Sequence, residues 1–118
     1  MPTIVFASPK GGAGKSTSAV LLASQLAEGG HTVTVIDADR NHPVADWARR
    51  PARLDVLDSI TEDTIIGTIE AAGARADYVI VDLEGTANLM QAYAISRADL
   101  VIVPSQGSHL AASRQGRP

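Results

Sequence analysis

The sequence contains no cysteine, and only two of its ten basic residues are lysines. The lack of cysteine excludes disulfide bonds, thiolate metal sites and iron–sulfur clusters. Basic residues are fewer than acidic ones, and the net charge of −3 argues against a surface built for indiscriminate nucleic-acid binding. No apolar run is long enough to cross a membrane, and Pro9 and Lys10 interrupt the apolar N-terminus that a signal peptide would need. We therefore expect a cytoplasmic protein.

The composition is that of an ordinary globular protein with one domain at most. The chain has 118 residues, of which 45% are hydrophobic and 19% charged. No internal repeat and no linker marks a second domain. We expect one domain over residues 1–105, followed by a polar tail over residues 106–118. The tail has two glycines and one large apolar residue, Leu110, so we expect it to be poorly ordered.

Strands and helices are predicted to alternate along the chain. Apolar runs predict strands at residues 3–7, 31–37, 54–57, 78–83 and 99–104. Apolar residues at helical spacing predict helices at residues 15–28, 44–50, 59–74 and 88–98. Gly29-Gly30 is expected to end the first helix, and Ser59 to Glu62 is a possible capping box for the third. This alternation predicts an α/β fold, a doubly wound and mainly parallel five-stranded sheet with helices on both faces.

The connection between the first strand and the first helix is rich in glycine. Residues 8–17 are Ser-Pro-Lys-Gly-Gly-Ala-Gly-Lys-Ser-Thr. Glycines let successive N–H groups converge on one point, and the helix N-terminus adds unpaired donors, so this context favours phosphate binding over a flexible turn. Lys15 would reach the β- and γ-phosphates, and the Ser16 hydroxyl would ligate Mg²⁺. The predicted nucleotide-binding residues are Gly11, Gly12, Ala13, Gly14, Lys15, Ser16 and Thr17.

Aspartates stand at the ends of two predicted strands. Asp37 and Asp39 close the second strand, and Asp82 ends the aliphatic run that begins at Tyr78. Ligands of open α/β sheets lie beyond the carboxyl ends of the strands, so these acids should lie near the phosphate loop. Asp82 has the Walker B arrangement, a carboxylate that binds magnesium through water. For Asp37 and Asp39 the alternative is a residue that only caps a turn.

The segment from Lys10 to Thr17 resembles the deviant Walker A motif of the ParA/MinD ATPases, which partition plasmids and position division sites. Its mark is a second lysine, here Lys10, five residues before the usual one. The resemblance implies an ATPase that binds ATP and Mg²⁺ and dimerises on ATP, with Lys10 reaching the phosphates of the partner copy. Lys10, Lys15 and Asp39 would be catalytic. Ser16 would bind the metal directly, and Asp39 and Asp82 would bind it through water.

A second pattern resembles the VirC subgroup, which is linked to conjugative DNA transfer. It consists of Asp37, Asp39, Asn41 and Pro43, followed by Trp47. The resemblance implies a partition-type protein partner and DNA. Contact with DNA would need weakly basic surfaces, such as Arg49, Arg50 and Arg53, or parts of the family that this sequence lacks. A solvated face is the alternative for these arginines. No membrane contact is expected.

The resemblance covers residues 1–105 and about the first half of the family, so the expected fold is a truncated one of the P-loop NTPase type. The family order places strand 78–83 beside strand 3–7, and strand 99–104 on the other side. Residues 100–103, which are apolar and uncharged, would then form a sheet edge. The leading function is Mg-dependent ATP hydrolysis. The alternatives are a nucleotide-binding fragment that does not hydrolyse, and a ligase of the dethiobiotin synthetase type, which the Lys10 signature disfavours.

Overall fold

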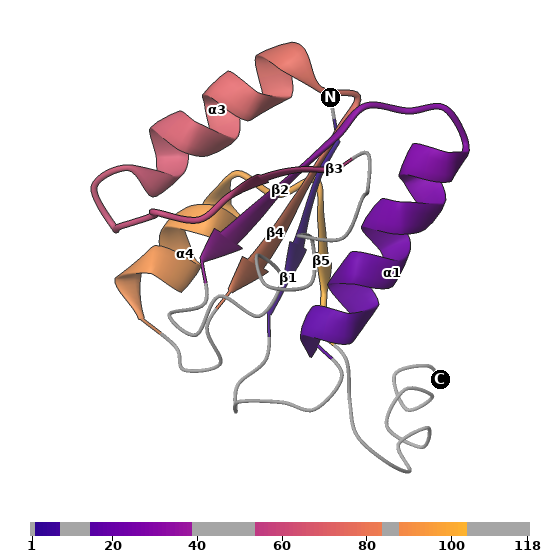
Figure 1. Ribbon diagram of the computed structural model, residues 1–118. Coiled ribbons are helices and arrows are strands. Elements are labelled where there is room, and N and C mark those ends of the chain that lie inside the picture. Colours follow the sequence, from indigo (N-terminus) through magenta and orange to yellow (C-terminus); the bar gives the residue numbers. More distant parts are fainter. Residues whose placement is uncertain (1, 8–14, 39–53, 84–87, 104–118) are drawn as a thin grey trace, which may run out of the picture.

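The computed structural model describes residues 2–7, 15–38, 54–83 and 88–103. Five strands of these residues form one parallel sheet in the order β3-β2-β4-β1-β5 (Figure 1). The strands are β1 (Thr3–Phe6), β2 (Val33–Ala38), β3 (Leu54–Leu57), β4 (Tyr78–Leu83) and β5 (Leu100–Ile102), and the helices are α1 (Lys15–Glu28), α3 (Ile65–Arg75) and α4 (Leu89–Ser96). The predicted α/β fold is confirmed. So is the placement of β1 between β4 and β5.

Several predictions fall on residues outside the described segments. They are the phosphate loop at 8–14, Asp39, the helix at 44–50 with Trp47, the cluster of Arg49, Arg50 and Arg53, and the tail at 106–118. None of the helices in the described segments is long and apolar enough to cross a bilayer.

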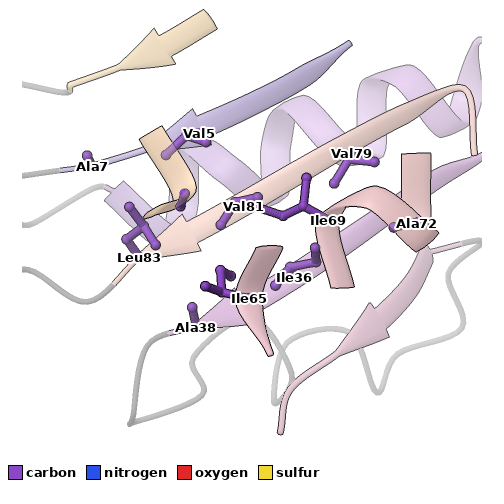
Figure 2. Packing of buried hydrophobic residues seen from close by; sticks show 11 residues of the cluster. Val5, Ala7, Ile36, Ala38, Ile65, Ile69, Ala72, Val79, Val81 and Leu83 are labelled. Carbon is purple, nitrogen blue, oxygen red and sulfur yellow. The ribbon is translucent and has the colours of Figure 1, made fainter. Parts of the chain in front are cut away.

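The two faces of the sheet are covered by different helices. Figure 1 shows α1 on one face and α3 and α4 on the other. Because side chains alternate along a strand, Val33 and Val35 of β2 pack on the α1 side, while Ile36 packs on the opposite side. Figure 2 shows the cluster on this second face, where Ile65, Ile69 and Ala72 of α3 lie against the sheet. The apolar face predicted for this helix is therefore confirmed.

The end of α1 is set by Gly29 and Gly30, as predicted. Gly30 has a φ of 94°, which L side chains rarely adopt. The N–H of Gly30 donates to the carbonyl of Ala27 over 3.1 Å, and the N–H of His31 donates to that of Leu26 over 3.1 Å. This pair of bonds is a Schellman motif, which satisfies the last carbonyls of the helix and turns the chain toward β2.

The predicted start of the third helix at Ser59 is wrong. α3 begins at Ile65, after a turn formed by Thr61 to Thr64. The Thr64 hydroxyl accepts a hydrogen bond from the N–H of Thr61 over 3.0 Å, and the N–H of Ile65 donates to the Thr61 carbonyl over 3.0 Å. The threonines thus have the three-residue spacing of a capping box, two residues later than the predicted pair. The first side chain of α3, Ile65, is the first fully buried residue of this segment, while Ile60 before it is only partly buried against the core.

Two aspartates tie neighbouring strands together at the amino-terminal edge of the sheet. Asp77 precedes β4, and its carboxylate accepts the N–H of Thr32, just before β2, over 2.9 Å. Asp99 precedes β5, and its carboxylate accepts the N–H of Thr3 in β1 over 2.7 Å. Each aspartate also donates its own N–H to the carbonyl of the same threonine. These paired bonds help to set the parallel registers of β2 with β4 and of β1 with β5.

We predict that the contribution of Asp77 to stability is lost in acid. The backbone hydrogen bond from Thr32 lowers the pKa of Asp77, with smaller contributions from the Thr32 hydroxyl and the nearby His31. A carboxyl group with a lowered pKa stabilises the fold above its ordinary pKa, and this stabilisation disappears as the pH falls through the folded-state value. Asp77→Asn should therefore lower the melting temperature at neutral pH, and the difference from wild type should shrink below about pH 4.

Thermal unfolding from neutral to acid pH measures this difference. Asp63→Asn, at an exposed position before α3, is the control and should match wild type throughout. A difference between Asp77→Asn and wild type that stayed constant with pH would show that the charge of Asp77 has no part in stability.

Candidate nucleotide-binding site

Two carboxylates lie side by side at the carboxyl-terminal edge of the sheet. Asp37 of β2 and Asp82 of β4 are opposite each other in the parallel register, and both are fully buried. Asp82 is also opposite Phe6 of β1. Residues opposite each other on neighbouring strands point to the same face, here the face that α1 covers. The fold therefore brings together two acids that are 45 residues apart in the sequence, by the difference 82 − 37.

The burial of this acidic pair is unusual for a structural core. Only four polar residues are buried in the described segments, and Asp37 and Asp82 are the only two of them that carry a carboxyl group. Burying a carboxylate costs several kcal/mol in desolvation unless other groups compensate it. Two buried aspartates side by side at the edge where parallel sheets bind ligands are therefore candidates for a functional site.

The start of α1 lies at the same edge of the sheet. β1 ends at Phe6, and α1 begins at Lys15 after the glycine-rich connection. In Figure 1 the first turn of α1 is at the end of the sheet toward which the strand arrows point. The N–H groups of a first turn have no partner within the helix and carry partial positive charge. An anion bound at this edge would meet these N–H groups from one side and, through a cation, the two carboxylates from the other.

The predicted site residues are only partly within the described segments. Asp82 lies at the predicted end of β4, and Thr17 is an exposed residue in the first turns of α1. Lys15 and Ser16 are the first two residues of α1, but their side chains are outside the described part of the structure, as are Asp39 and Gly11 to Gly14. Their roles remain predictions. From the sequence alone, Asp37 is either a site residue or a turn cap, and its full burial opposite Asp82 adds it to the candidate residues.

A cavity at the opposite end of the sheet does not correspond to this site. It has a volume of about 360 Å³ and is lined by residues of the amino-terminal edge, including Thr32, Asp55 and Arg75. Ligands of open parallel sheets bind at the carboxyl ends of strands instead. Within the described segments, no three histidine or acidic side chains gather closely enough to hold a metal ion on their own.

The strand order, the glycine-rich connection after β1 and the acids at the carboxyl edge define the class of α/β P-loop nucleotide-binding folds. Comparison with known proteins agrees with this class. A protein of Borrelia burgdorferi assigned to plasmid partition, solved with AMPPNP bound, matches with a TM-score of 0.74 and 19% identity over 98% of this chain and 65% of that one. At this identity the match supports the fold alone.

The chain belongs to the VirC1 family, whose model matches residues 1–114. Protein ParA of Rhizobium radiobacter is 45% identical over 116 residues, which cover 96% of this chain and 52% of that protein. Protein virC1 of Rhizobium rhizogenes is 32% identical over 113 residues, which cover 89% and 49%. The chain thus spans about half the length of these two relatives. The predicted ParA/VirC-type family is confirmed.

Proposed function

We propose that this chain binds ATP together with Mg²⁺ at the carboxyl-terminal edge of its sheet, and that it works as an ATPase of the ParA partition type. The observation that carries the proposal is the placement of two buried carboxylates, Asp37 and Asp82, at the edge where α1 begins. The family match favours a partition-type protein over the ligase alternative.

The proposed roles follow from charge. A triphosphate carries several negative charges, which Lys15, the N-terminus of α1 and Mg²⁺ would neutralise together. Ser16 would bind the metal directly, while Asp82 and Asp39 would hold its water ligands. Asp37, at the side of Asp82, would add to the negative field that retains the cation. Lys10 of a second copy of the chain would stabilise the negative charge that develops during phosphoryl transfer.

The test of this proposal is a calorimetric titration of the wild-type chain with ATP, once with Mg²⁺ and once with excess EDTA. Saturable binding with one nucleotide per chain, tighter with Mg²⁺, is expected. GTP is the competing nucleotide and should bind more weakly. If ATP does not bind under either condition, the proposal fails.

We predict that Asp82→Asn removes most of the Mg²⁺ dependence of ATP binding. The variant keeps the size of the side chain but loses the charge that holds the water ligands of the metal. A hydrogen bond to a charged group contributes about 1.5 kcal/mol at the low end, so the affinity for Mg-ATP should fall roughly 10-fold. The affinity measured in EDTA should barely change. Because removing one partner of a buried polar contact can destabilise a fold, circular dichroism and the melting temperature check that the variant is folded.

Asp55→Asn is the matched control for this variant. Asp55 lies on β3 opposite Thr34, away from the carboxyl-terminal edge, and accepts a long hydrogen bond of 3.5 Å from the Thr34 hydroxyl. The Asp55→Asn variant should bind nucleotide with the same affinity and the same Mg²⁺ dependence as wild type. An unchanged Mg²⁺ dependence in Asp82→Asn would exclude Asp82 from the metal site.

A second candidate function is nucleotide binding without hydrolysis. The described residues favour it, since they place the buried Asp37 and Asp82 beside the start of α1, while Lys10 and Asp39, which are proposed to act in hydrolysis, lie outside them. Phosphate release separates the two candidates. Release above a buffer control supports the ATPase, and release equal to the control, with ATP still bound, supports the binding unit.

A further inference from the structure

The cavity at the amino-terminal edge of the sheet lies between the ends of two helices and the starts of two strands. Its lining comes from the last turn of α1, the first residues of β2 and β3, and the end of α3. In Figure 1 both helices end on the side of the sheet from which the strand arrows start. The volume of about 360 Å³ is at the lower end of the roughly 300–1,000 Å³ that ligand sites usually have, so a small molecule fits it.

The floor of this cavity is apolar and its rim is charged. Ala27 of α1, Val33 of β2 and Ala76 at the end of α3 line it and are exposed by 6% or less. Asp55 of β3 and Arg75, the last residue of α3, line it as exposed residues. An apolar floor with a few polar groups around it is the usual composition of a small-molecule site.

Asp55 and Arg75 carry opposite charges that do not neutralise each other. Of the ion pairs in the described segments, none involves either residue. The Nε of Arg75 donates over 3.3 Å to the carbonyl of Ala71 in its own helix. The Asp55 carboxylate accepts the long hydrogen bond of 3.5 Å from the Thr34 hydroxyl. In the described part of the chain, the other N–H groups of this guanidinium and most lone pairs of this carboxylate are therefore open to a ligand.

His31, another residue of the lining that can carry charge, already has a carboxylate beside it. Its Nδ1 lies 3.8 Å from the carboxylate of Asp77, and its ring packs edge-on against Tyr78 with 5.1 Å between the ring centroids. The Asp77 carboxylate also accepts the N–H of Thr32 over 2.9 Å. These groups are engaged with one another, so Asp55 and Arg75 are the charges that a ligand in the cavity would meet.

We propose that this cavity binds a small zwitterion of the α-amino-acid class, with its carboxylate on Arg75 and its ammonium group on Asp55. A guanidinium presents parallel N–H groups that match the two oxygens of a carboxylate. An ammonium group can donate both to the Asp55 carboxylate and to the Thr34 hydroxyl beside it. A molecule with a single charge would leave one of the two protein charges without a partner, so the cavity favours a ligand with both. This site is separate from the proposed nucleotide site, which lies at the opposite edge of the sheet.

Nuclear magnetic resonance titrations of the ¹⁵N-labelled wild-type chain test the proposal, with each of the standard amino acids as a probe. At least one should cause saturable shifts of the amide signals of Thr32, Thr34, Asp55 and Ala76. The two analogues that lack its amino group or its carboxyl group should bind at least about 10-fold more weakly, because each loses a charge-assisted hydrogen bond. The absence of such shifts with every amino acid, or equal affinity of the analogues, would overturn the proposal.

Two variants test which residue meets which charge. Arg75→Gln should bind the amino acid at least about 10-fold more weakly and should no longer prefer it to the amine that lacks the carboxyl group. Asp55→Asn should lose the preference over the acid that lacks the amino group. Arg97→Gln and Asp63→Asn change exposed charges that do not line the cavity, so these matched controls should bind like wild type. A purely structural role would weaken all three probes alike, and this result, or an unchanged preference, would overturn the proposal.

Discussion

Lys15→Ala should strongly weaken the binding of Mg-ATP while leaving the fold intact. A charged donor to phosphate contributes roughly 1.5 to 3 kcal/mol, so the loss of this ammonium group weakens binding by up to about 100-fold. Lys15 is the first residue of α1, and the first buried residue described in this helix is Ala19. The fold should therefore survive the loss of the Lys15 side chain. Calorimetric titration measures the affinity, and the circular dichroism spectrum and melting temperature measure the fold.

Lys10→Ala is the charge-matched control for this experiment, because Lys10 is the only other lysine of the chain. Its proposed role is in phosphoryl transfer, so it should bind Mg-ATP with an affinity close to that of wild type. Equal affinity of Lys15→Ala and wild type would remove the phosphate-loop proposal. Equal loss in both variants would mean that general positive charge attracts the nucleotide, without a specific role for Lys15.

Lys10→Ala should lose turnover by about 10³-fold if the chain hydrolyses ATP, because a cation that stabilises the transition state of phosphoryl transfer has an effect of this size. Asp39→Ala should also stop turnover, but by another route. It removes the carboxylate proposed to position the attacking water, so the variant should retain unhydrolysed ATP. Phosphate release measures turnover, and chromatography of the nucleotide that remains with the filtered protein distinguishes ATP from ADP.

Arg97→Ala is the control for the loss of a cation. Arg97 follows α4 and lies 3.4 Å from the Glu70 carboxylate in an exposed ion pair, away from the carboxyl edge of the sheet. Such pairs contribute little to stability, so turnover should not change. Wild-type phosphate release no faster than the buffer control would end the ATPase proposal and leave the non-hydrolysing binding unit. Binding of Mg-ATP by the same sample would show that the nucleotide site is still present.

Local pattern was enough to place most of the elements. The helix over residues 15–28 and the strand over residues 78–83 were predicted with the bounds that the structure gives. The long apolar runs and the Gly29-Gly30 stop are features of neighbouring residues, so short-range preferences decide them. The start of α3 was misplaced because two pairs with the three-residue spacing of a capping box, Ser59 with Glu62 and Thr61 with Thr64, lie in succession. The choice between them depends on tertiary packing, since Ile65 is the first fully buried residue of this segment.

The sequence by itself determined the alternation of strands and helices, the glycine-rich loop before α1 and the acids at strand ends, because each depends on residues close together in the chain. Only the tertiary structure decided which strands are neighbours. It placed Asp37 opposite Asp82, and it joined Asp77 to Thr32 and Asp99 to Thr3, because these pairs depend on the order of strands in the sheet. The family resemblance had indicated part of that order. The burial of the acidic pair, and with it the candidate role of Asp37, required the packed sheet, since burial depends on what α1 covers.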